Sequence, residues 1–306
     1  MAIRSQYIRQ LLDAVDNNNA NRICIYQEEN EQKLIDIGIE VHKYNTTCPF
    51  VERVWNRTQQ LGDENYSVII HGKHNHEETR ATFSHSQKNA PSIIVKNLAE
   101  TKYLVDFIDG TMKKDEFMNL FEGKYSEGFD PDVHLTKVGV VNQTTMLATE
   151  TNEIARLIKE AIAKKFGADR LKEYFADTRD TLCYATNDNQ QATYSLLQSK
   201  ADFAIVVGGY NSSNTSHIVE LCEEKLPTYY ISTANEILAK NMIRHYDHHT
   251  SSMKTSKNFL PDKDKVEVIL TSGASCPDAT VEDVLQTILS FYDGVKPVED
   301  VLADFN

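Results

Sequence analysis

Two cysteines stand in similar polar settings and could hold a metal or a redox group. Cys48 is followed by Pro49 and an apolar helical pattern, and Cys183 precedes a second helix-like segment. Pro49 suits the first turn of a helix, where its missing N–H costs nothing. A thiol at a helix start meets the positive end of the helix dipole, which favours thiolate and hence metal ligation or redox chemistry. For either cysteine taken alone, a buried and inert thiol is the alternative.

A second chemically rich segment is the loop after the expected strand 66–70. It contains three histidines and two glutamates, namely His71, His74, His76, Glu77 and Glu78. Histidine and carboxylate are zinc ligands, so a zinc site is one interpretation. The other is an exposed polar loop, because His74 and His76 lie two residues apart, whereas helical zinc motifs place their histidines four apart. The residues alone leave both interpretations open.

Three further loops are rich in hydroxyl and amide side chains and follow apolar strand-like runs. They cover residues 143–145, 211–214 and 273–275. Serine, threonine and asparagine side chains can bind an anion together with the backbone N–H groups of a helix start, without any lysine or arginine. Each loop taken alone could be an ordinary helix N-cap. Together with the cysteines and the histidine loop, they favour a diphosphate site.

The elements that must position these loops alternate between strand and helix. Strand-like runs are expected at 66–70, 92–95, 138–141, 203–207, 228–231 and 266–270, with amphipathic helices between them. This alternation predicts α/β units built on parallel sheets. Ligands in such folds bind at the carboxyl ends of the strands, so we expect all these loops to form one site. Residues 109–134 are expected to be a surface excursion with short helices. The run Arg244–Ser256, with His245, His248 and His249, is expected to be a polar loop without a role.

Composition narrows the class of protein. The 306 residues include 45 acidic and 32 basic side chains, and the net charge of −13 argues against nucleic acid or an anionic membrane as a partner. No run reaches the roughly 18 apolar residues of a membrane helix, and no secretory signal is recognisable, so a cytoplasmic location is expected. The five cysteines are odd in number and scattered, which argues against a disulfide framework.

The motifs together resemble the LytB/IspH family of 4-hydroxy-3-methylbut-2-enyl diphosphate reductases. The similar runs occur in the family's order between about residues 40 and 290: Thr47–Pro49, His76–Glu78, Gln143–Thr145, Cys183–Thr186, Asn211–Asn214 and Gly273–Ser275, followed by Pro277 and Asp278. The resemblance implies a pseudo-threefold arrangement of small α/β units, with mostly parallel sheets, around a central 4Fe-4S cluster. By this reading residues 1–47 are a remnant of the first unit, 48–180 the second unit and 181–306 the third.

The resemblance also implies roles for individual residues. Cys48 and Cys183 would be cluster ligands. Glu78 and Thr144 would be catalytic, with Glu78 feeding protons to the allylic hydroxyl, and the substrate would be bound by His76, Thr145, Ser212, Ser213, Asn214 and Ser275. The implied reaction is the reductive dehydroxylation of the allylic diphosphate to isopentenyl and dimethylallyl diphosphates, in the non-mevalonate isoprenoid pathway. A ferredoxin or flavodoxin would supply the electrons.

The sequence departs from the family at its beginning. Residues 1–44 contain no Gly-Phe-Cys motif, which supplies the first cluster ligand in the family. Cys24 lies in the middle of an expected strand and is expected to point into a sheet. We therefore expect a chain that lacks most of the first unit, either truncated or a paralogue without cluster chemistry. A diphosphate-binding protein and a zinc-dependent hydrolase using His74, His76 and Glu78 are the alternative functions.

Overall fold

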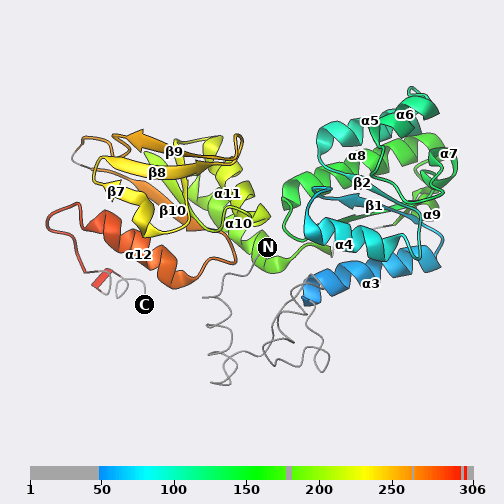
Figure 1. Cartoon of the computed structure of the whole chain (residues 1–306). Coiled ribbons are helices and arrows are strands. Elements are labelled where there is room, and N and C mark those ends of the chain that lie inside the picture. Colours follow the sequence, from blue (N-terminus) through cyan, green and yellow to red (C-terminus); the bar gives the residue numbers. More distant parts are fainter. Residues whose placement is uncertain (1–47, 177–180, 264, 298–299, 302–306) are drawn as a thin grey trace, which may run out of the picture. The chain divides into compact units, whose positions relative to one another are not determined.

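The computed structural model describes residues 48–176, 181–263, 265–297 and 300–301. They fall into two compact units, the first ending at Cys183 and the second beginning at Tyr184 (Figure 1). The boundary expected from the sequence lay three residues earlier, after residue 180. The remnant expected at residues 1–47, with Cys24, lies outside the described residues. The arrangement of the units around a common site stays a prediction.

The first unit is a parallel sheet covered by helices on both faces. The strands lie in the order β2-β1-β3-β4, and each adjacent pair is parallel. Its elements are α3 (Pro49–Asp63), β1 (Ser67–His71), α4 (Glu77–Ser86), β2 (Ser92–Val95), α5 (Leu98–Ile108), α6 (Lys114–Leu120), α7 (Pro131–His134), β3 (Val138–Asn142), α8 (Ala148–Phe166), α9 (Leu171–Tyr174) and β4 (Phe175–Ala176). The predicted α/β class with parallel sheets is confirmed.

Alternate residues of the same strands pack into two different cores. Ile69 of β1 packs in one cluster with residues of α5 and α8, such as Leu104 and Ile158. Val68 and Ile70 pack in the other cluster with residues that include Val54 of α3. Because successive side chains of a strand point to opposite faces, a strand covered on both sides must be apolar throughout. Continuous apolar runs therefore mark these strands in the sequence.

The segment between α5 and β3 is more deeply packed than its sequence suggested. It contains two short helices, α6 and α7, as expected. However, Phe117, Phe121 and Phe129 are at most 5% exposed and belong to the core on the α5 side. The expected surface excursion is therefore partly a cover for the sheet, because burying three phenylalanine rings stabilises the fold far more than leaving them in water.

The second unit combines a parallel and an antiparallel sheet. The parallel sheet has the order β10-β5-β6, and the antiparallel sheet has the order β7-β8-β9. Its elements are α10 (Tyr184–Leu196), β5 (Phe203–Val207), α11 (Ser213–Glu223), β6 (Thr228–Ile231), the 3-10 helix η3 (Ala234–Glu236), β7 (Ile237–Ala239), β8 (Met242–Asp247), β9 (Ser252–Lys257), β10 (Val268–Ser272) and α12 (Asp278–Leu289).

The expectation of a polar loop over residues 244–256 is wrong. β8 and β9 pair as an antiparallel hairpin, with Met242 opposite Lys257 and Asp247 opposite Ser252. The polar composition conceals the strands, because much of the hairpin faces water and only Ile243 is fully buried in the core. Cross-strand pairing and packing against β6 decide its structure rather than a hydrophobic run.

The two units repeat one loop geometry at the carboxyl ends of their strands. Gly72 follows β1 and Gly208 follows β5, and the N–H of each glycine donates to the last residue of the neighbouring strand, Val95 or Ile231, at 3.0 Å. In both units the next helix has its N-cap four residues after the glycine. The same short connection thus brings a helix N-terminus to the same edge of each sheet.

A threonine seven residues after each glycine explains why glycine is required. A Cβ atom on Gly72 would lie 2.5 Å from Thr79 Oγ1, and one on Gly208 would lie 2.7 Å from Thr215 Oγ1. Both distances are shorter than the contacts that Cβ atoms make in proteins. The strand end and the helix can therefore pack this closely only because glycine has no side chain.

Candidate active site

Both ligand-type cysteines lie at helix starts, as their sequence context predicts. Cys48 is the N-cap residue of α3, and Cys183 immediately precedes α10. Both thiols are free and partly exposed. Leu61 near the end of α3 lies against Gly139 near the start of β3, so α3 runs antiparallel to the strands and Cys48 faces the carboxyl edge of the sheet. Thiols with this placement suit an iron–sulfur group.

A buried hydrogen bond ties the segment before Cys183 to the same sheet edge. Thr181 Oγ1 donates to Asn142 Oδ1 at 2.6 Å, and the Asn142 amide nitrogen donates to the carbonyl oxygen of Gln143 at 2.9 Å. Asn142 is the last residue of β3, and all three side chains are buried. The approach to Cys183 is therefore fixed beside the Gln143–Thr145 loop.

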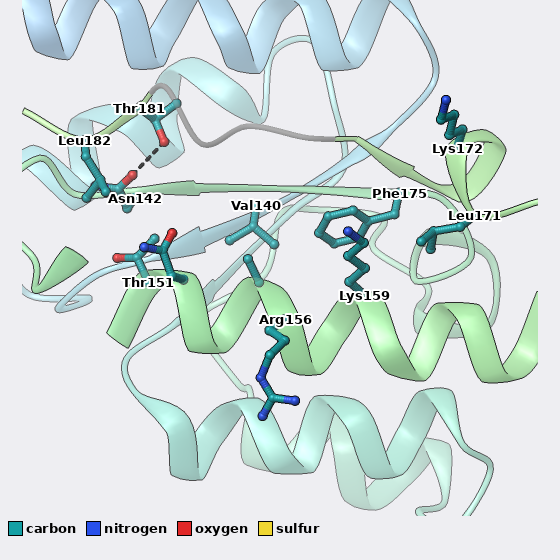
Figure 2. A pocket seen from close by; sticks show the side chains of 12 residues that line it. Val140, Asn142, Thr151, Arg156, Lys159, Leu171, Lys172, Phe175, Thr181 and Leu182 are labelled. Atoms are coloured by element: carbon teal, nitrogen blue, oxygen red, sulfur yellow. Dashed lines mark hydrogen bonds between the residues drawn. The ribbon is translucent and has the colours of Figure 1, made fainter. Parts of the chain in front are cut away.

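The Asn142–Thr181 bond also lies at the edge of a cavity of about 590 Å³ within the first unit (Figure 2). Its lining comes from β3, α8, α9, β4 and the segment before Cys183: Val140, Asn142, Thr151, Asn152, Ala155, Arg156, Lys159, Leu171, Lys172, Phe175, Thr181 and Leu182. Among the described residues that line this cavity, none was predicted from the sequence to take part in catalysis or binding. The sequence-predicted loops lie outside this cavity.

The histidine loop does not assemble a zinc site. His76 is the N-cap of α4, and its Nδ1 atom accepts a hydrogen bond from the Glu78 N–H at 3.3 Å. His74 is exposed, whereas Glu78 is buried. Within the parts of the chain that the structure describes, these three residues do not form a group of potential metal ligands. The zinc-hydrolase alternative therefore has no support in this geometry.

Glu78 lies in the first turn of α4, and its buried carboxyl group is held by the loop that follows β3. Its side chain is 6% exposed, and Oε1 accepts a hydrogen bond from the Thr144 N–H at 2.5 Å. Burial raises the pKa of Glu78, and the hydrogen bonds from Thr144 oppose this shift in part. The carboxyl group consequently keeps its proton to a higher pH than an exposed glutamate, which suits a proton donor.

Gln143 organises the surrounding loop, although the sequence analysis assigned it no role. Its Oε1 accepts from the Lys73 N–H at 3.1 Å and from Thr79 Oγ1 at 2.9 Å, while Nε2 donates to Thr145 Oγ1 at 2.6 Å. The amide thus joins the loops after β1 and β3 and orients Thr145. The only signal in the sequence is an amide residue at a strand end, which does not reveal its partners.

The second unit presents a helix N-terminus with an unsatisfied polar group. Ser212 caps α11 by accepting from the Thr215 N–H at 3.2 Å. Asn214 is 4% exposed, yet within the described chain neither its amide nitrogen nor its amide oxygen has a hydrogen-bond partner. Buried polar groups are normally satisfied, and the start of a helix favours negative charge. The arrangement fits an anionic ligand at this helix end.

Ser213 and Ser275 complete the set predicted for this unit. Ser213 is buried, and its Oγ lies 3.5 Å from Nε2 of His217, a residue that the sequence analysis did not single out. His217 is also paired through Nδ1 with Glu220 at 2.8 Å. Ser275 is exposed in the loop after β10, two residues beyond Gly273, which contacts α11 at Thr215. The predicted roles of these residues in binding stay predictions.

Comparison with known proteins agrees with this geometry. The family model described as LytB protein matches residues 26–289. The chain is 42% identical over 258 residues to the 4-hydroxy-3-methylbut-2-enyl diphosphate reductase of Crocosphaera subtropica, covering 84% of this chain and 62% of that relative. It is 42% identical over 247 residues to the enzyme of the same name from Trichodesmium erythraeum, covering 80% of this chain and 60% of that one. The chain thus spans about three fifths of the length of these curated relatives.

A solved structure supports the fold. The E-1-hydroxy-2-methyl-but-2-enyl-4-diphosphate reductase from Plasmodium falciparum aligns with a TM-score of 0.51 at 22% identity, over 80% of this chain and 59% of that chain. Among the described residues, no helix has the length and apolar character needed to cross a membrane.

Proposed function

Because this chain belongs to the LytB family, we propose that it carries out the reductive dehydroxylation of 4-hydroxy-3-methylbut-2-enyl diphosphate. In this reaction the allylic C–O bond breaks and the hydroxyl group leaves with one proton as water. The allylic fragment takes up two electrons and a second proton, which gives isopentenyl or dimethylallyl diphosphate. The chain must therefore bind a diphosphate, supply protons and admit electrons.

The observation that carries this proposal is the buried pair of Glu78 and Thr144. The carboxyl group of Glu78 has a raised pKa and is oriented by the Thr144 N–H. A carboxyl group whose pKa is raised keeps its proton to a higher pH and can protonate a leaving hydroxyl, which is a poor leaving group without that proton. Thr144 orients Glu78, while Gln143 fixes the position of the Thr145 hydroxyl by donating to it.

The start of α11 supplies the proposed diphosphate site. The Asn214 amide would gain the hydrogen bonds that it lacks within the described chain, and Ser212 and Ser213 would add hydroxyl groups at the positive end of the helix. Ser275 and His76 are the further proposed contacts. Binding through backbone N–H groups and neutral side chains needs no lysine or arginine.

Cys48 and Cys183 would hold an iron–sulfur cluster of the 4Fe-4S type. Their donor atoms fit such a group, since both are free thiols at helix starts. When bound, the cluster would pass on, one at a time, the two electrons that the electron donor supplies. Cys222 is buried in the core of the second unit, so it is not a candidate for the third thiolate that the family uses. We propose a ferredoxin or flavodoxin as the electron donor, and a cytoplasmic location stays a prediction.

The test is turnover of the full chain after anaerobic reconstitution with iron and sulfide. A chemical reductant replaces the electron donor, and mass spectrometry detects isopentenyl and dimethylallyl diphosphates. Glu78→Gln should lower kcat by at least about 100-fold, the order contributed by a positioned acid. Glu77→Gln is the matched control, because this neighbouring carboxylate on α4 is exposed, and it should leave kcat unchanged.

Binding is measured separately with inorganic pyrophosphate and calorimetry. Asn214→Ala should weaken pyrophosphate binding by about 10-fold or more, because this is the affinity that hydrogen bonds to a charged group typically contribute. Glu78→Gln should not weaken pyrophosphate binding. Iron-loaded chain that binds pyrophosphate but yields no product would reject the reductase in favour of the diphosphate-binding alternative. That alternative also requires binding to survive Cys48→Ser and Cys183→Ser.

A further inference from the structure

A cluster of histidine and carboxylate side chains lies in the second unit, away from the residues considered so far. Glu223 is the last residue of α11, and His248 and His249 follow β8 in the turn to β9. One possible ligand atom from each of the three residues lies within 4.8 Å of the other two. Two elements separated by about 25 residues of sequence thus bring three potential metal ligands together.

The distances within the cluster suit a single small cation. His249 Nε2 lies 2.9 Å from Glu223 Oε2, and the ring centroids of His248 and His249 are 3.8 Å apart. Nε2 of His248 lies 3.5 Å from Oε1 of Glu220, one helical turn before Glu223. Two ligands bound tetrahedrally at about 2.1 Å from zinc are themselves roughly 3.4 Å apart. Glu220 thus lies beside His248 but outside the group of three mutually close ligand atoms.

His248 gives an independent sign of a missing partner. Its side chain is only 11% exposed, and among the described residues neither ring nitrogen has a hydrogen-bond partner, although Nε2 lies within ion-pair distance of Glu220. Leaving buried polar atoms unsatisfied costs about 1–3 kcal/mol for each group. A metal ion bound to one ring nitrogen would remove part of this cost.

The turn that carries the two histidines is held in place by its own contacts. Oδ1 of Asp247 accepts hydrogen bonds from the N–H groups of His249 at 2.9 Å and Thr250 at 3.1 Å. The second carboxylate oxygen of Asp247 pairs with Lys254 on the opposite strand. The histidines are thus presented by an ordered turn, which reduces the entropy lost on binding a metal.

We infer that Glu223, His248 and His249 bind one divalent transition-metal ion of the zinc type. Imidazole and carboxylate ligands suit zinc rather than magnesium or calcium, which prefer oxygen ligands alone. Three protein ligands would leave the fourth position of a tetrahedral site to a water molecule. The ion would fasten the β8–β9 hairpin to the end of α11. This site uses contacts of the second unit alone and does not depend on the proposed reductase function.

The test uses zinc and the full chain in which Cys48, Cys183 and Cys276 are replaced by serine, so that the partly exposed thiols cannot bind the metal. Competition with a chromophoric zinc chelator gives affinity and stoichiometry. We expect one equivalent of zinc and a higher Tm when zinc is present. His249→Ala should weaken zinc binding by at least about 100-fold. Removing a residue that only hydrogen-bonds to a metal ligand already costs up to about 100-fold in affinity, and His249 is a direct ligand in this proposal.

His249 is the best first variant because its side chain is 63% exposed, so its removal leaves the core intact. His245→Gln is the matched control: this histidine lies on the same hairpin, but its Nε2 bonds to Ser256 at 2.9 Å, outside the cluster. It should bind zinc as the parent does. Parent protein without a zinc site, or equal zinc affinity in His249→Ala, would overturn the inference.

Cobalt supplies a second measurement that does not depend on that variant. Co²⁺ in a tetrahedral site with nitrogen and oxygen ligands should give strong visible absorption in the parent, and Glu223→Gln should lose it while far-UV circular dichroism stays unchanged. Visible absorption that is equally strong in Glu223→Gln would place the cobalt elsewhere and reject the site.

Discussion

Gly273 is the position where one added methyl group should have the largest calculable effect. It follows β10, and a Cβ atom there would lie 2.0 Å from Thr215 Oγ1, 3.1 Å from Thr215 Cβ and 3.5 Å from Thr215 Cα. Thr215 also packs closely against Gly208, so its side chain has little room to rotate away from the first clash. Gly273→Ala must therefore move either α11 or the loop that carries Ser275.

The geometry gives the size of the effect. Overpacking a close-packed site costs typically about 1–3 kcal/mol, and we expect the upper end because the 2.0 Å clash involves a Thr215 side chain that is packed against both Gly208 and Gly273. Thr215→Ala should cost only about 1 kcal/mol, comparable to losing one buried methyl group. In the described structure the Thr215 hydroxyl makes no hydrogen bond that would be lost. The double variant should recover about 2 kcal/mol of the sum, because the 2.0 Å clash disappears.

Urea unfolding followed by far-UV circular dichroism measures these free energies. Trp55, the single tryptophan, lies in the first unit, so its fluorescence is the less suitable probe for this site. Gly209→Ala is the control, since in the described structure a Cβ atom at Gly209 meets nothing within 4 Å. The reasoning fails if Gly273→Ala is no more destabilising than Gly209→Ala, or if Thr215→Ala brings no recovery.

Three further predictions concern buried polar groups. The raised pKa of Glu78 means that the folded chain binds this proton more tightly than the unfolded chain, where a glutamate titrates near about 4.3. The stability that this proton contributes is complete below that pH and is lost as the pH rises toward the raised pKa of Glu78, by up to about 1.4 kcal/mol per pH unit. Urea unfolding at several pH values should therefore show a free energy of unfolding that falls with pH, and Glu78→Gln should remove this dependence. Gln143→Met should cost about 1–3 kcal/mol of unfolding free energy in the same assay, because the buried hydroxyl of Thr79 loses its acceptor; an unchanged urea midpoint would refute the bonding described. Burial raises the pKa of the Cys222 thiol to about 12, so iodoacetamide should modify Cys222 only after unfolding, as mass spectrometry of the native and denatured chain would reveal.

The sequence could determine the features that depend on local rules. Apolar runs located the parallel strands, since a strand covered on both faces must be apolar throughout. Pro49 marked the start of α3 and thereby placed Cys48 at a helix N-terminus. The order of the cysteine, histidine and serine motifs was enough to indicate the family, which the match over residues 26–289 confirmed.

Only the tertiary structure decided which side chains meet. Gln143 joins two loops through Lys73 and Thr79, which lie about 70 residues before it, and no local pattern encodes that contact. The β8–β9 hairpin escaped sequence analysis because its stability comes from cross-strand pairs rather than from an apolar run. For the same reason the sequence did not reveal that the turn of this hairpin brings His248 and His249 close to Glu223. Helix starts and apolar strands follow from neighbours in sequence, whereas the polar hairpin, the ligand clusters and the buried networks follow from neighbours in space.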